Sequence, residues 1–145
     1  MYRYIRAMAA QRSQLKLLIL QSSGQIVEHI LKILMFPNVT TTNHWESEIY
    51  AFLPRIQKVK GSNKLPGENF ILDALTSYND NLKIFIPSIL ESESEFTPAD
   101  LDLRVAEQAI YEYQKWLAHE LATFGSVTPN SVKNELNSII EKYSR

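Results

Sequence analysis

Residues 97–125 read TPADLDLRVAEQAIYEYQKWLAHELATFG and carry the longest helical pattern in the chain. Apolar residues recur there at intervals of three or four, which places them on one wide stripe of an α-helix. They are Leu103, Ala106, Ile110, Tyr113, Leu117, Leu121 and Phe124, with Trp116 beside them. Thr97-Pro98 followed by an acid is typical of a helix start, and Gly125 is typical of a C-terminal cap. We therefore predict a helix over residues 97–124, central because its apolar face is wide enough to contact several neighbours.

The same period continues to both sides of this stretch. The expected helices cover about residues 3–21, 25–35, 43–56, 66–86, 87–90, 97–124 and 129–143. Ser22-Ser23-Gly24 either breaks the first two apart or bends one long helix, and Pro54 predicts a kink near residues 50–53. Asn43 resembles the cap of a capping box, and residues 91–95 form an acidic connector that buries nothing. No stretch alternates long enough to indicate a strand, so we predict an all-α fold.

The composition fits one domain over residues 1–145, a compact bundle of five to seven helices. Of the 145 residues, 45% are hydrophobic and only four are glycine, which supplies a core and argues against disorder. Cysteine is absent, which excludes disulfides, thiolate metal sites and thiol nucleophiles. We expect no apolar run to reach the roughly 18–20 residues that span a bilayer. We expect a cytoplasmic protein without a membrane partner.

Charge is divided unevenly along the chain, although the net charge is only −1. Residues 1–64 hold nine Lys and Arg against three acids, and residues 65–145 hold six against thirteen. Such a division indicates either a surface for nucleic acid or two halves that attract each other within or between molecules.

Catalytic and metal-binding patterns are weak. The three histidines, His29, His44 and His119, are candidate metal ligands, but no two of them have the i, i+3 or i, i+4 spacing that aligns ligands on one helix face. No nucleophile elbow and no glycine-rich phosphate loop is present. We expect no cofactor, and a metal-dependent enzyme of the helical-bundle type is the third alternative.

Two groups of basic residues are candidates for nucleic-acid binding. In the first, Arg3 and Arg6 alternate with aromatic residues, so that cations could neutralise phosphates while rings stack on bases. The second group comprises Arg55, Lys58, Lys60 and Lys64. Against this alternative, the whole chain is slightly acidic, with a pI near 6.3.

Aromatic residues favour a different reading. Trp45 and Trp116 are candidate contact residues, because aromatic side chains are enriched at protein interfaces. We therefore predict a small helical binding or regulatory protein that acts through protein contacts or self-association, with nucleic-acid binding by the basic half as the alternative.

A short pattern also resembles a known family. His29-Ile30-Leu31-Lys32, then Pro37, then Trp45 and Ile49 is similar to the central pattern of the bacterial domain-of-unknown-function family numbered 29. The resemblance covers about residues 12–60, and the chain departs from it with Ile33 after the lysine and Asn43-His44-Trp45-Glu46 around the tryptophan. It implies an all-helical bacterial protein without an assigned activity.

Overall fold

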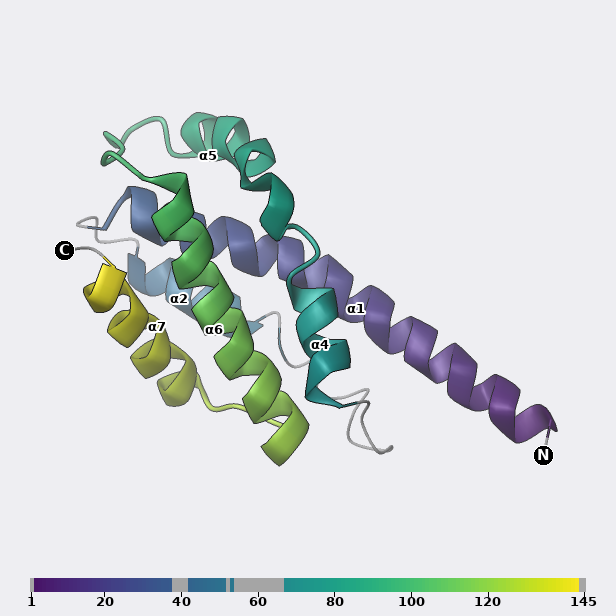
Figure 1. Ribbon diagram of the computed structural model, residues 1–145. Coiled ribbons are helices and arrows are strands. Elements are labelled where there is room, and N and C mark those ends of the chain that lie inside the picture. The colour runs from purple at the N-terminus through teal and green to yellow at the C-terminus, as the bar shows by residue number, and fades with distance from the viewer. Residues whose placement is uncertain (1, 38–41, 52, 54–66, 144–145) are drawn as a thin grey trace.

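The chain folds as a compact all-α bundle, which confirms the predicted fold class. The computed structural model describes residues 2–37, 42–51, 53 and 67–143, and for residues 2–15, 42 and 43 it describes the backbone alone. These residues form α1 (Tyr2–Met35), α2 (Thr42–Ala51), α4 (Glu68–Leu75), the 3-10 helix η1 (Asn79–Phe85), α5 (Ile86–Ser92), α6 (Leu103–Phe124) and α7 (Pro129–Tyr143), without a strand. α6 lies between α4 and α7, with α1 and α2 behind it (Figure 1).

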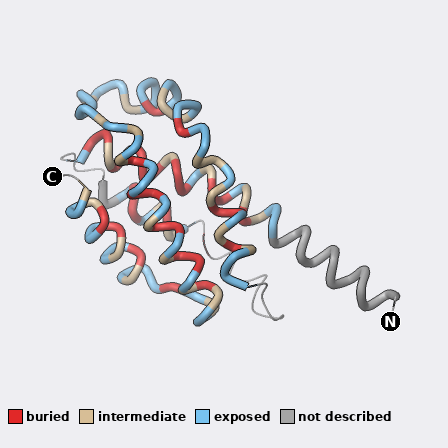
Figure 2. Tube along the Cα trace, in the orientation of Figure 1, coloured by how far each residue is buried: buried red, intermediate tan, exposed pale blue. Residues whose placement is uncertain are grey.

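Helix α6 is the centre of the bundle, as its wide apolar face predicts. It contacts α1, α4, η1 and α7. Its buried residues follow the helical period and face inward (Figure 2). They are Ala106, Ala109, Ile110, Tyr113, Gln114, Leu117, Ala118 and Leu121.

The predicted start of this helix at Thr97-Pro98 is wrong, because α6 begins six residues later, at Leu103. The backbone N–H of Ala99 donates to the carbonyl oxygen of Met35 over 2.8 Å, which satisfies an open acceptor at the C-terminal end of α1. Asp102 is the N-cap instead, and its carboxylate accepts from the N–H of Arg104 over 2.9 Å. A contact between distant segments therefore overrides the local start signal.

The small residues Ser22, Ser23 and Gly24 neither break nor end α1, which runs as one helix of 34 residues. Both serines are buried, and the Ser23 hydroxyl donates to the carbonyl oxygen of Leu20 over 2.9 Å. A Cβ atom at Gly24 would lie 3.4 Å from the ring of Tyr78. These small side chains therefore let a tyrosine from another part of the chain lie directly on the helix.

The helix expected over residues 66–86 is divided, which corrects the sequence prediction. α4 ends at Leu75, where the Thr76 hydroxyl donates to the carbonyl oxygen of Leu72 over 2.9 Å. The turn positions Asn79, which exchanges two side-chain hydrogen bonds of 2.7 and 3.0 Å with buried Gln114 of α6. The Gln114 amide also donates to the carbonyl oxygen of Leu75 over 2.8 Å. A side chain of α6 therefore satisfies a hydrogen-bond acceptor at the C-terminal end of α4.

Helix α2 begins at Thr42, so Asn43 lies within its first turn and is not the cap. It ends at Ala51, and the N–H of Leu53 donates to the carbonyl oxygen of Tyr50 over 3.0 Å in a tight turn just before Pro54. The rest of the helix expected up to residue 56 lies outside the described residues.

The C-terminal signals are confirmed. Gly125 caps α6 with a left-handed φ of 79°. Thr128 and Ser131 cap α7 reciprocally, since each hydroxyl accepts from the backbone N–H of the other over 3.1 Å. The α7 face that these caps position packs on α2 and α6 through Val132, Leu136 and Ile139.

We expect Gly125→Ala to lower the free energy of unfolding by about 1 kcal/mol, because alanine is strained at this φ. Urea denaturation followed by circular dichroism measures the change. Gly67→Ala is the control, since the φ of Gly67 is −62° and no atom of the described residues lies within 4 Å of its missing Cβ. An equal loss in both variants would contradict the prediction.

Candidate functional site

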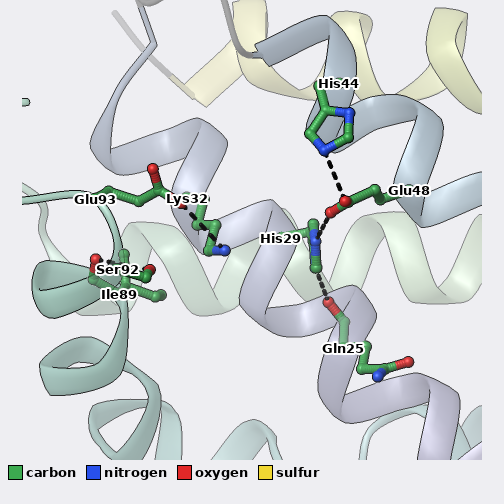
Figure 3. Close-up of polar contacts among 8 residues, drawn as sticks. All are labelled: Gln25, His29, Lys32, His44, Glu48, Ile89, Ser92 and Glu93. Atoms are coloured by element: carbon green, nitrogen blue, oxygen red, sulfur yellow. Dashed lines mark hydrogen bonds and ion pairs between the residues drawn. The ribbon is translucent and has the colours of Figure 1, made fainter.

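Two of the three histidines share one carboxylate between α1 and α2 (Figure 3). His29 of α1 contacts Oε2 of Glu48 through its Nε2, and Nε2 of His44 lies 2.7 Å from Oε1 of the same residue. His29 is almost fully buried, whereas His44 is exposed. The carboxylate thus joins the C-terminal part of α1 to the first turns of α2.

Both ring nitrogens of His29 have a polar partner. Nδ1 lies 2.7 Å from the carbonyl oxygen of Gln25 on the same helix, an atom that can only accept a hydrogen bond. Nε2 faces Oε2 of Glu48 on α2. The histidine and the carboxylate therefore form a polar contact between two helices.

The histidines do not converge on a metal site. His119 belongs to α6 and lies 3.3 Å from Oε1 of Glu68 on α4, in a separate contact. Each oxygen of Glu48 faces its own imidazole, so the ring nitrogens point at the carboxylate and not at a common centre (Figure 3). Among the described residues, no group of three or more His, Asp and Glu has the arrangement of a metal site.

The acidic connector contributes one buried contact, contrary to the expectation that it buries nothing. Glu93, directly after α5, lies 3.4 Å from Nζ of Lys32 on α1, and both side chains are mostly buried (Figure 3). This ion pair fastens the end of α5 to the bundle.

The candidate nucleic-acid residues cannot be assembled into one surface from the described structure. Arg3 and Arg6 lie in the part of α1, residues 2–15, for which only the backbone is described. The other four residues, Arg55, Lys58, Lys60 and Lys64, lie outside the described residues. Whether these six residues bind nucleic acid stays a prediction.

The two tryptophans have different environments. Trp45 is only 3% exposed and packs on Phe36, with ring centroids 6.2 Å apart. Its position is that of a core residue, so its ring offers no open contact surface. Trp116 is partly exposed and packs on Tyr113, with centroids 5.6 Å apart.

A pocket of about 310 Å³ lies where the end of α1, the start of α6 with the segment before it, and the end of α7 meet. Its apolar lining comes from all three segments, and Asp100 and Asp102 supply carboxylates. We call it the α1–α7 pocket, and its lining residues are Leu34, Pro37, Ala99, Asp100, Leu101, Asp102, Val105, Ala106, Ile140 and Tyr143. An apolar depression with a few charged groups is the usual form of a binding site.

Sequence reasoning missed this pocket. Its residues come from three segments of the chain. One of these segments, residues 99–102, lies where the sequence predicts a regular helix from Thr97. The available signal was Asp100 and Asp102, two acids two residues apart beside apolar residues, but their spacing alone does not show a concave surface.

The segment Lys16–Met35 is long and apolar enough to cross a membrane, with a mean hydropathy of 1.2. This corrects the expectation that no run reaches that length. Half of the segment is buried inside the bundle, and the core helix of a protein in water has the same character.

Comparisons with known proteins give no relative. No protein-family model matches the chain, and no curated protein or solved structure matches it. The resemblance of residues 12–60 to the family numbered 29 therefore stays a hypothesis.

Proposed function

We propose that this chain is a small helical binding protein that acts through protein contacts, and that the α1–α7 pocket receives a basic, partly apolar segment of its partner. The observation that supports this proposal is the combination of an apolar lining with Asp100 and Asp102. A regulatory role, a cytoplasmic location and a bacterial source belong to the same proposal and are supported by sequence patterns alone.

The lining chemistry defines the ligand. Aliphatic walls from Leu34, Val105 and Ile140 favour apolar side chains, at roughly 25 cal/mol per Å² of apolar surface buried. Two carboxylates favour a lysine or arginine next to them, and each exposed ion pair contributes up to about 1 kcal/mol. Apolar contact therefore supplies most of the affinity, and the carboxylates select the sign of the ligand's charge.

A lysine next to the pocket lining already has a carboxylate partner. Lys142, next to the lining residue Tyr143, donates to Oε1 of Glu112 over 2.9 Å. This contact raises the pKa of Lys142 and lowers the pKa of Glu112. The lysine is thus paired with a carboxylate of α6. Asp102 uses one carboxylate oxygen in the α6 cap, and it lines the pocket together with Asp100, where the two acids favour a cation of the ligand.

The test is an NMR titration of the full chain with a peptide in which arginines alternate with leucine and tyrosine. We expect the backbone amide signals of Leu101, Val105 and Ile140 to change their chemical shifts. The variant Asp100→Asn/Asp102→Asn should bind the peptide about tenfold more weakly, because two ion pairs are lost. Asparagine keeps the cap of α6, so the helix start is preserved.

Asp73→Asn/Asp80→Asn is the matched control, because it removes the same charge from exposed positions that do not line the pocket. Its affinity for the peptide should equal that of the unmodified chain. Shifts confined to other surfaces, or equal weakening in both double variants, would refute the proposal.

A single-stranded DNA oligonucleotide in the same titration distinguishes the nucleic-acid alternative. We expect it not to bind. Binding of the oligonucleotide with a steep salt dependence, together with no binding of the peptide, would replace the proposed function by phosphate recognition in the basic half.

A further inference from the structure

The N-terminal half of α1 extends beyond the bundle, past α4 (Figure 1). Leu17 is 56% exposed, and burial of the helix begins at Ile19 among the residues whose side chains are described. Most of the stability of a helix in a protein comes from the tertiary packing of its apolar face. No acidic residue lies in the first turn of α1, although an acid there would favour the helix dipole. A partner that covers this half would therefore stabilise it.

The sequence of this half has the chemistry that the pocket favours. Tyr2-Arg3-Tyr4-Ile5-Arg6 alternates cations with aromatic and aliphatic residues, and Met8, Arg12, Leu15 and Lys16 continue the mixture. No acid occurs before Glu28. Charge complementarity thus exists between this half and the two carboxylates of the α1–α7 pocket.

The two complementary parts cannot meet within one molecule. The pocket includes Leu34 and Pro37 at the C-terminal end of α1, and Arg6 lies 28 residues away along a continuous helix. At a rise of 1.5 Å per residue, that separation is about 42 Å. A second copy lying antiparallel removes this separation, because the start of each α1 then lies beside the end of the other.

We propose that the chain forms an antiparallel two-fold dimer in which the N-terminal half of each α1 docks at the α1–α7 pocket of the other copy. The arrangement closes on itself and fills two identical sites at once. It rests on the proposed function, since it identifies the basic, partly apolar segment as residues 2–16 of a second copy.

The test is sedimentation equilibrium of the full chain and of two variants, alone and mixed. Arg3→Glu/Arg6→Glu reverses the charge of the first turns of the docking segment, residues 2–8, in which Arg3 and Arg6 are the charged residues. Asp100→Lys/Asp102→Asn reverses the charge of the pocket and keeps the α6 cap. We expect the unmodified chain to dimerise, more weakly at high salt. Each variant alone should dimerise at least tenfold more weakly, because in both of its sites the first turns of α1 then meet a pocket of like charge. The mixture should dimerise again, because both sites of the mixed pair join opposite charges.

Circular dichroism checks that α1 still forms in Arg3→Glu/Arg6→Glu, and glutamates in the first turn suit the helix dipole. A monomeric unmodified chain would overturn the dimer, as would a dimer that neither variant weakens or a mixture that stays monomeric. If such a monomer still binds the arginine-rich peptide at the pocket, the proposed function stands and only its occupant is wrong. If the peptide also fails to bind, the proposed function fails with the dimer.

Discussion

Replacing Trp45 by alanine is expected to lower the free energy of unfolding by about 3–5 kcal/mol, as for other large aromatic residues in cores. The ring is 3% exposed and lies against Phe36, whose own ring is 5.9 Å from that of Phe96. This aromatic group joins α2, the end of α1 and the segment before α6. Its loss would leave a cavity that three separate segments border.

The matched control is Trp116→Ala, for which we expect a loss of about 1–2 kcal/mol, because Trp116 is already partly exposed. Urea denaturation followed by circular dichroism suits both variants, since each removes a fluorescent tryptophan. Equal losses, or a larger loss at Trp116, would contradict the assignment of Trp45 to the core and return it to the set of candidate contact residues.

The helical fold could be predicted because apolar residues recur once per turn over most of the chain. The end of α6 at Gly125 and the start of α7 at Thr128-Pro129 could also be predicted, because caps act through neighbours in sequence. Thr97-Pro98 carries a similar signal and fails, because the N–H of Ala99 bonds to Met35. Local signals therefore predict a helix end only where no distant backbone group competes for the same donors.

The candidate site was less predictable than the fold. Glu48 stands four residues after His44, but nothing in the spacing shows that the same carboxylate also contacts His29, 19 residues earlier. The α1–α7 pocket likewise requires the packing of α7 on α6, which periodicity does not give. Contacts between segments depend on packing order, and that order is a property of the whole chain.

A buried carboxylate with incomplete compensation lies where α2 packs on α7. Glu46 is 8% exposed, and its Oε2 has no hydrogen-bond partner within the described part of the chain. Burial raises the pKa of Glu46, and Lys133 opposes that shift only in part. Burial also raises the pKa of Glu135 on α7, with smaller contributions from Glu112 and Glu120.

The buried hydroxyl of Tyr113 experiences the same surroundings. It lacks a hydrogen-bond partner among the described residues, and its pKa is raised first by burial and then by the charges of Glu135 and Glu46. The interface of α7 therefore concentrates negative charge in a region of low polarity, where an ionised carboxylate costs stability.

Glu46→Leu is therefore expected to raise the free energy of unfolding at neutral pH by about 1–3 kcal/mol, the usual cost of a buried polar group without a partner. A glutamate whose pKa is raised by folding destabilises the fold when ionised, and protonation relieves this as the pH falls through the raised value. The advantage of the variant should thus shrink as the pH approaches the ordinary glutamate value of 4.5.

Urea denaturation of both proteins from neutral to acidic pH measures this difference at each pH. Contributions to the pH dependence of stability that are common to both proteins cancel in this difference. Glu112 is one of them: its hydrogen bond to Lys142 lowers its pKa, so its contribution to stability is lost as the pH falls. Glu107→Leu, at an exposed position of α6, should leave stability nearly unchanged across the range. If Glu46→Leu instead lowers stability at neutral pH, the carboxylate makes a favourable contact, and the packing of α7 depends on that charge.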